Sequence, residues 1–220
     1  MLVVVNSHAG GTAARTLLHQ LGQLGMPTLH VSGGEKRTAW YNVSRTLQRL
    51  DVQHDSIDFT GIIALLEHPQ ALKNEESFFY LHDTTTIDAL FHARLTSLTY
   101  HGTCALGKHP SNNIGVYRVS DLLQHRSRIL AMRSTSHPSA CERLEIKRKG
   151  FDAEDVVFKL VFAHYRQEWC ALSARSVLKT PSHFYSNTTK RIRLIYKDWG
   201  IVKYSANWEG HRRGYYVLSE

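Results

Sequence analysis

The most informative carboxylate of the chain is Asp83, which ends the apolar run FFYLHD and is followed by three threonines. A buried carboxylate is costly unless it is hydrogen-bonded, paired with a cation or bound to a metal. In open α/β sheets, ligands bind beyond the carboxyl ends of the strands. Asp83 is therefore either a ligand-binding residue or the N-cap of a helix in TTTIDAL, where Thr84 or Thr85 would serve as well.

A second acidic pair, Glu154 and Asp155, opens the segment DAEDVVFKLVFAHYRQ. Apolar residues recur there at helical spacing, so we expect a helix that begins near Asp152. With Asp152 as the N-cap, Asp155 would occupy the third helical position, where a carboxylate suits the backbone N–H groups and the helix dipole. The pair either caps this helix or serves the chemistry of the protein.

Several familiar active-site signatures are absent from the sequence. It contains neither of the common glycine-rich phosphate loops and no G-x-S-x-G, which disfavours an α/β-hydrolase. Its fourteen histidines and three cysteines form no H-E-x-x-H or C-x-x-C motif, so we expect no zinc site. Sparse cysteines in odd number favour a reducing compartment.

The formal charge of +8 is unevenly distributed, with seven Lys or Arg and two acidic residues between Lys190 and Arg213. Such a run binds a polyanion, such as nucleic acid or a nucleotide diphosphate, or it is a solvated basic face. The sequence shows no apolar run near the roughly 20 residues of a membrane span and no basic leader. We therefore expect a cytoplasmic protein without a membrane span.

Strand-like and helix-like patterns alternate over the first 95 residues. LVVVN indicates a buried parallel strand, TAARTLLHQLGQLGMP an amphipathic helix and TLHV a second strand. Further helices are expected in TAWYNVSRTLQRL, DSIDFTGIIALLEHP and TIDALFHARL, and the strand that ends at Asp83 precedes the last of these. This alternation predicts an α/β fold, with a Rossmann-like nucleotide-binding half over residues 1–95 and a mostly parallel sheet.

The second half of the chain, residues 96–220, has a less regular pattern. NNIGVYRVSDLLQHR predicts a strand followed by a helix from about Ser120, and KRIRLIYKDWGIVKYSANW predicts one or two strands. The sequence contains no internal repeat and no low-complexity linker. We therefore expect a single domain over residues 1–220 with a more irregular C-terminal half.

Taken in order, these segments resemble the GT-A glycosyltransferases, which transfer a sugar from a nucleotide diphosphate donor. Asp83 at a strand end, the glycine-bearing NNIGVY and the helix-opening AED follow the order of that family's D-x-D, glycine-loop and x-E-D motifs. DFTGIIALLEHP, FFYLHDT and YKDWGIVKYSANW are also similar to segments of small glycosyltransferase domains from large DNA viruses of algae and related microbial proteins. The resemblance touches most of residues 1–208 through short motifs.

The resemblance implies a nucleotide-sugar donor with UDP as the nucleotide, a glycan or glycoprotein acceptor, and inversion at the transferred sugar. Asp83 would bind Mn²⁺ or Mg²⁺, which neutralises the leaving diphosphate. Asp155 would take the proton of the acceptor hydroxyl, and Glu154 would bind the acceptor or support that base. This acidic pair would act in the second half of the chain, 96–220.

Further donor contacts are implied at five positions of the sequence. Asn6 and Ser7, at the end of the first strand, would contact the base and ribose. Asp58 would bond the uracil or ribose, or cap its own helix. Gly115 would belong to the glycine loop, or to a turn before a strand. Lys203, in the basic run, would bind the diphosphate.

The chain departs from the family pattern at Leu81, which stands where D-x-D has its first Asp. His82 could replace that ligand, although strand alternation points it to the opposite face. His183 and His211 are candidates for the C-terminal histidine that completes the metal shell in many relatives. The missing Asp keeps open a catalytically inactive, sugar-binding protein of the same fold.

A nucleic-acid-binding module is the other alternative, because the sequence pI is about 9.5 and Tyr and Trp interleave with the basic run. The sequence contains no helix-turn-helix, zinc-finger or RNA-recognition signature. We therefore expect no nucleic-acid partner.

Overall fold

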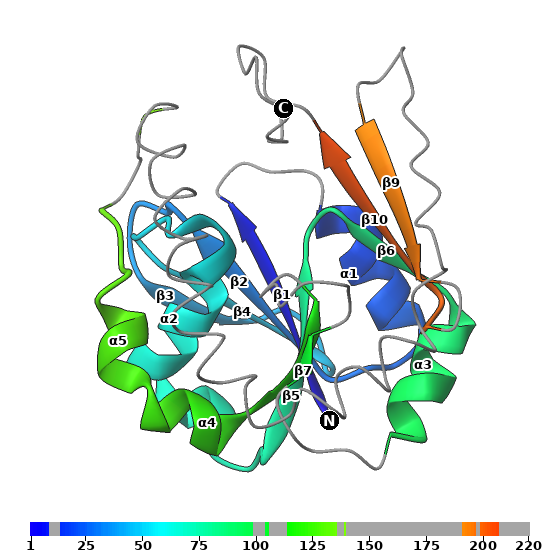
Figure 1. Ribbon diagram of the computed structural model, residues 1–220, viewed down its shortest axis with the longest axis horizontal. Helices are drawn as coiled ribbons and strands as arrows, with labels where there is room; N and C mark the ends of the chain where they lie inside the picture. Colours follow the sequence, from blue (N-terminus) through cyan, green and yellow to red (C-terminus); the bar gives the residue numbers. More distant parts are fainter. Residues whose placement is uncertain are drawn as a thin grey trace.

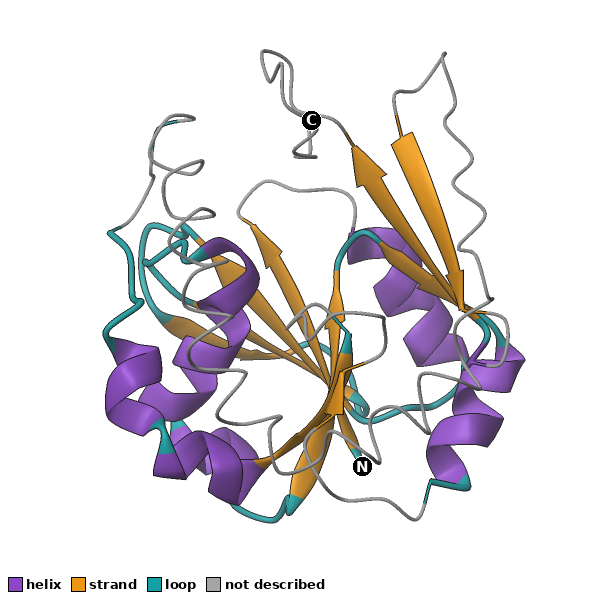
Figure 2. Ribbon diagram, in the orientation of Figure 1, coloured by secondary structure: helices purple, strands orange, loops and turns teal. Residues whose placement is uncertain are grey.

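The computed structural model describes residues 1–8, 14–98, 104–105, 114–135, 139, 191–196 and 199–206. The strands of these residues form two sheets (Figure 1, Figure 2). The larger has seven strands in the order β3-β4-β2-β1-β5-β8-β7, and the smaller has three in the order β6-β10-β9.

Four neighbouring strands at the centre of the larger sheet run parallel: β4 (Leu47–Asp51), β2 (Thr28–Gly33), β1 (Leu2–His8) and β5 (Ser77–His82). Three strands at its edges pair antiparallel to their neighbours: β3 (Ala39–Asn42), β8 (Gly115–Arg118) and β7 (Cys104–Ala105). The strands β1 and β5 are covered on both faces, and their sequences LVVVNSH and SFFYLH consist largely of continuous apolar runs. This arrangement confirms the predicted α/β fold with a largely parallel, Rossmann-like sheet.

Helices cover both faces of the larger sheet (Figure 1). One face carries α1 (Ala14–Gln23) and α3 (Ala89–Thr96). The other carries α2 (Thr60–Glu67), α4 (Val119–Gln124) and α5 (Arg126–Leu130), with the 3₁₀ turns η1 (Ile57–Phe59) and η2 (Pro69–Leu72) flanking α2. The helices expected in residues 12–27 and 55–69 are confirmed, as is the strand and helix expected in NNIGVYRVSDLLQHR.

Alternation along β1 divides the core between these two faces. Val3 and Val5 contact the cluster of α1 and α3, whereas Val4 contacts the cluster of α2. Successive side chains of a strand point to opposite faces. Asn6 and His8 therefore continue the α2 face, and Ser7 continues the other.

The smaller sheet packs beside α1 and α3 (Figure 1). It consists of the antiparallel strands β6 (Thr85–Ile87), β10 (Ile201–Ala206) and β9 (Arg191–Tyr196), which confirms two strands in KRIRLIYKDWGIVKYSANW. Trp199, just before β10, lies with its ring centroid 5.6 Å from that of Phe79. This contact joins the C-terminal hairpin to the core of the larger sheet.

The helix expected over residues 38–50 is wrong, because this segment is the hairpin of β3 and β4. Its aromatic and β-branched residues favour strands. Leu50 is fully buried and pairs in register with Val31 of β2. The Ser44 hydroxyl accepts hydrogen bonds from Thr46 N and Leu47 N in the turn.

The helix expected in TIDALFHARL begins later than its pattern indicates. Residues Thr85–Ile87 form β6, and α3 starts at Ala89, where the Asp88 carboxylate accepts a hydrogen bond of 2.8 Å from Leu90 N. Since a strand separates Asp83 from this helix, Asp83 is not its N-cap. The helix-capping interpretation of Asp83 is therefore wrong, and so are those of Thr84 and Thr85.

Candidate functional site

The strand order places a topological switch point between β1 and β5. The chain leaves β1 toward β2 on one side and later returns to β5 on the other. Right-handed crossovers in opposite directions place α1 and α2 on opposite faces of the sheet. A crevice opens at the carboxyl ends of two such strands, and ligands of open α/β sheets bind there. The residues at these ends are His8, His82 and Asp83.

Asp83 directly extends the pairing of β5 with β1. Its N–H donates a hydrogen bond of 2.9 Å to Asn6 O, and its side chain belongs to the buried polar residues. Burial raises the pKa of the Asp83 carboxyl, and the charge of Asp58 acts in the same direction. The fold thus holds a carboxylate at the switch point against the preference of that carboxylate for water.

Two cationic groups favour the charged form of Asp83. His8 and Lys203, together with the Thr84 N–H, lower the pKa of Asp83 against the effect of its burial. Lys203 comes from β10, where it pairs in register with Thr85. The smaller sheet therefore brings a cation from the C-terminal part of the chain to a carboxylate of the central sheet.

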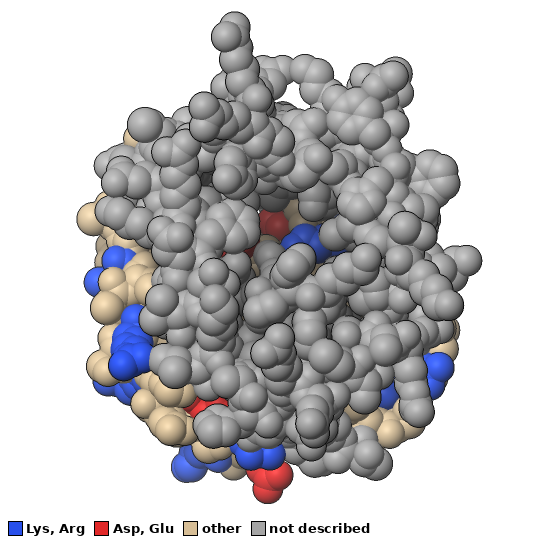
Figure 3. All heavy atoms as spheres, viewed as in Figure 1, with Lys and Arg blue, Asp and Glu red and all other residues tan. Residues whose placement is uncertain are grey.

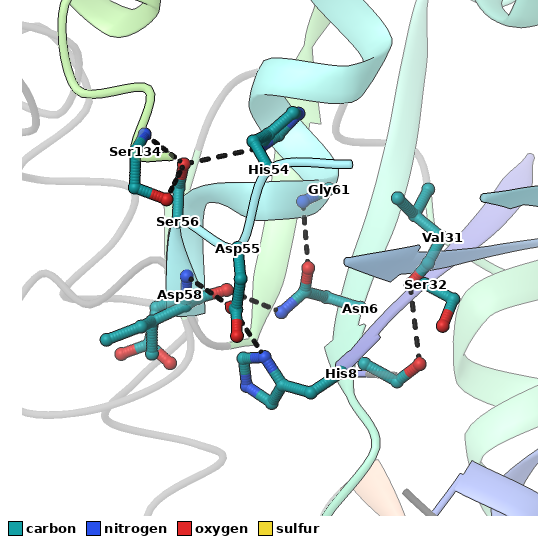
Figure 4. Close-up of polar contacts among 12 residues, drawn as sticks. Asn6, His8, Val31, Ser32, His54, Asp55, Ser56, Asp58, Gly61 and Ser134 are labelled. Atoms are coloured by element: carbon teal, nitrogen blue, oxygen red, sulfur yellow. Dashed lines mark hydrogen bonds and ion pairs between the residues drawn. The ribbon is translucent and has the colours of Figure 1, made fainter. Parts of the chain in front are cut away.

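His8 forms an ion pair with Asp55, whose Oδ1 lies 2.7 Å from His8 Nδ1 (Figure 4). The His8 side chain is 25% exposed and that of Asp55 only 2%. Burial lowers the pKa of His8, but the hydrogen bond to Asp55 and the charges of Asp55, Asp83 and Asp58 outweigh it, so the pKa of His8 lies above its usual 6.5. Asp55 thus holds the partly exposed His8 ring in place and favours its protonated state.

The turn that carries Asp55 and Asp58 is fastened to the sheet by buried polar groups (Figure 4). The Asn6 amide donates to Ile57 O at 2.9 Å and accepts from Gly61 N at 2.8 Å. The Tyr80 hydroxyl donates to Asp58 O at 3.0 Å. Both central strands, β1 and β5, therefore hold this turn in place.

Ile57 adopts a strained backbone conformation, with φ of 53°. This left-handed region costs a β-branched residue about 1–3 kcal/mol, and such strain collects at functional sites. Asp55 Oδ1 accepts a hydrogen bond of 3.2 Å from Ile57 N, so the carboxylate that anchors His8 also stabilises the strained residue. On the other side of Ile57, Asp58 Oδ1 lies 3.4 Å from His82 Nδ1.

Two further histidines are buried near the ends of the central strands. His54 Nδ1 lies 3.2 Å from Ser56 Oγ, and burial together with Arg133 lowers the pKa of His54 to about 4. His30 Nε2 lies 2.6 Å from Ser7 Oγ, and burial lowers its pKa to about 4 as well. Both rings are neutral structural residues at neutral pH.

The structure brings together three of the residues that the sequence predicted: Asp58, Asp83 and Lys203. The side chains of Asn6 and Ser7 are buried and bonded within the protein. Their contact with the base and ribose stays a prediction.

Other predicted residues lie at the edge of the site or outside the described part of the chain. Gly115 is the first residue of β8 and pairs with Tyr80, so it lies at the carboxyl end of β5 in a strand. The following predicted residues lie outside the described residues: Glu154, Asp155, His183 and His211.

Sequence reasoning missed His8 and Asp55. The first strand was expected to end near Asn6, but it continues to His8. Alternation after the apolar run would have placed Val4, Asn6 and His8 on one face. Asp55 carried no comparable signal, because its contact with His8 spans 47 residues of sequence.

A divalent metal would find a single carboxylate of the expected kind at the switch point. Leu81 is fully buried in the core, and no group of three His, Cys, Asp or Glu among the described residues is arranged to hold a metal. Mg²⁺ commonly uses one or two carboxylates and completes its shell with substrate phosphates. Asp83 fits that mode, and it is faced by Asp58 as a second acidic group.

In the space-filling view, acidic and basic atoms of described residues lie beside each other near the middle of the face shown (Figure 3). The described helices are all too short or too polar to cross a lipid bilayer.

Comparisons with known proteins give a weak likeness to a solved structure. No family model and no curated protein matches the sequence. Among solved structures, the chain is similar to a glycosyltransferase involved in the glycosylation of the major capsid of PBCV-1, with a TM-score of 0.38 and 10% identity. The alignment covers 58% of this chain and 65% of that one, so the chain spans less than two thirds of that protein. At this TM-score the likeness carries no argument about activity.

Proposed function

We propose that the protein is a glycosyltransferase that takes its sugar from a nucleotide diphosphate donor, with UDP as the nucleotide. The observation that carries the proposal is a buried carboxylate, Asp83, held at the switch point of a Rossmann-like sheet beside two cationic residues. A carboxylate that burial disfavours needs a reason to be there, and a bound cation or a hydrogen-bonding ligand supplies one.

The donor diphosphate would lie beyond the ends of β1 and β5. Asp83 would hold Mn²⁺ or Mg²⁺ there, and the bound ion would supply the positive charge that stabilises the leaving diphosphate. Among the described residues, the three carboxylates Asp55, Asp58 and Asp83 act on His8, and Lys203 acts on Asp83. A further positive charge would be favoured in this acidic surrounding before an anion binds.

The acceptor half of the reaction rests on the resemblance of AED to the x-E-D motif. Asp155 would take the proton of the acceptor hydroxyl, and Glu154 would bind the acceptor or support the base. A base of this kind leads to inversion, because the acceptor attacks the sugar from the side opposite the diphosphate. The acceptor would be a glycan or a glycoprotein.

The first test of the donor site is thermal stabilisation by nucleotides. UDP and GDP should be compared with and without Mn²⁺, in the parent protein and in Asp83→Asn. A ligand at 100 times its Kd stabilises the folded state by about 2.7 kcal/mol, which raises Tm by roughly 5–11 °C for a protein of this size. We expect UDP with Mn²⁺ to stabilise the parent and to have little effect on Asp83→Asn.

The control variant is Glu76→Gln, which removes an exposed carboxylate just before the opposite end of β5. It should respond to UDP as the parent does. Because burial disfavours the charge of Asp83, Asp83→Asn should be at least as stable as the parent without ligand, which separates lost binding from unfolding. If neither nucleotide stabilises the parent, the assignment of the donor site is refuted.

Turnover distinguishes an enzyme from an inactive sugar-binding protein of the same fold. Slow hydrolysis of UDP-sugars, measured as release of UDP, requires no knowledge of the acceptor. We expect Asp155→Asn to leave UDP binding intact and to abolish this hydrolysis and the transfer. Binding without any turnover of any UDP-sugar would favour the inactive protein.

A further inference from the structure

We propose that His8, oriented by Asp55, binds the phosphate groups of the donor and is one of the protein's own cations for the leaving diphosphate. This inference rests on the proposed function and adds a residue and a role to its donor site. Its basis is the place of the His8 ring, at the carboxyl end of β1, beside the end of β5 that carries Asp83.

The ring of His8 is fixed through Nδ1, and among the described residues its other nitrogen, Nε2, has no hydrogen-bond partner. Nδ1 donates to Asp55 Oδ1 at 2.7 Å, and the imidazole is 25% exposed while its partner is almost fully buried. With Nδ1 bound in this way, the Nε2–H of the protonated ring remains as a donor for a ligand. An ionised donor forms short, strong hydrogen bonds with phosphate oxygens.

The groups that face His8 favour its protonated form. Among the described residues, they are Asp55 from the loop after β4, Asp58 from η1 and Asp83 from the end of β5, and all three are acidic. Lys203 of β10 acts on Asp83 from the smaller sheet. A diphosphate bound here would therefore meet two protein cations, one from each sheet.

A strained residue and buried polar groups hold Asp55 in its position. The Asp55 carboxylate also accepts a hydrogen bond from the N–H of Ile57, a residue with positive φ. The Asn6 amide donates a hydrogen bond to the same turn. A surface ion pair between mobile side chains would need none of these contacts. The network is what an anion-binding histidine requires, because its ring must not turn away when the ligand binds.

The test compares His8→Asn and His8→Gln with the parent for binding of uridine, UMP and UDP, by calorimetry in EDTA and in Mn²⁺. The Asn amide can replace Nδ1 as the donor to Asp55 but offers no outward cation. If a charged hydrogen bond to phosphate is lost, the affinity for UDP should fall on the order of ten- to a hundredfold. The affinity for uridine should change by less than about twofold, since uridine has no phosphate.

The matched control is His92→Asn, which replaces an exposed histidine on α3 and should bind all three ligands as the parent does. Asp55→Asn should weaken the binding of UDP more than the binding of uridine, because the group that orients the His8 ring loses its charge. Equal losses for uridine and UDP, or no loss in either His8 variant, would overturn the role of His8 while the donor site stands. A parent that binds neither UDP nor GDP would overturn the donor site, and the role of His8 with it.

Discussion

Replacement of Asn6 by alanine should be one of the most damaging single changes in the described part of the protein. Its fully buried amide satisfies Ile57 O and Gly61 N, which belong to the strained turn before α2. A buried backbone group that loses its partner costs about 1–3 kcal/mol. Two such groups give about 4 kcal/mol, a large part of the roughly 5–15 kcal/mol by which domains are stable.

Urea denaturation gives the free energy of unfolding, and calorimetry should show Tm lowered by roughly 8–16 °C. Ser7→Ala is the control from the same strand. It removes the hydroxyl that lies 2.6 Å from the neutral His30 ring and donates to Val31 O at 3.5 Å, and it should cost about 2 kcal/mol, since the His30 nitrogen loses its partner. Asn6→Asp keeps the acceptor for Gly61 N, and its protonated form also restores a donor. Its cost relative to the parent should therefore shrink as pH is lowered. If Asn6→Ala costs no more than Ser7→Ala, the amide does not hold the turn.

Two further predictions concern packing and pH. Gly61→Ala should lower the free energy of unfolding by about 1–3 kcal/mol, because a Cβ there would lie 2.7 Å from the Tyr80 hydroxyl oxygen. Gly22→Ala, with open space around it, should raise the free energy of unfolding by about 0.5–1 kcal/mol. Urea denaturation measures both values, and equal effects would contradict the contact with Tyr80. His30 and His54 have pKa values of about 4 against an ordinary 6.5, so the unfolded chain takes up protons first as pH falls. The stability that their neutral forms provide is complete above pH 6.5 and is lost toward pH 4, by about 2 kcal/mol per histidine at pH 5. Denaturation midpoints that stay constant from pH 7.5 to 5 would show that these rings are not buried in neutral form.

The sequence by itself determined the class of the fold and the position of its most informative carboxylate. Continuous apolar runs such as LVVVN predict strands that are buried on both faces, and apolar residues at helical spacing predict α1 and α2. These predictions succeed because the burial pattern of an element follows from the order of its own residues. The same reasoning placed Asp83 at a strand end. It failed in residues 38–50, where isolated helical spacing competed with strand-forming residues whose partner, β2, lies elsewhere in the sequence.

Only the tertiary structure decided what surrounds Asp83. His8, Asp55 and Lys203 come from three distant parts of the chain, and their approach depends on the strand order and on the docking of the smaller sheet. The structure also excluded the helix cap at Asp83, since β6 intervenes before α3. Electrostatic interactions act over a few ångströms in space and carry no sequence period, so residue order alone could identify the carboxylate but not the cations that face it.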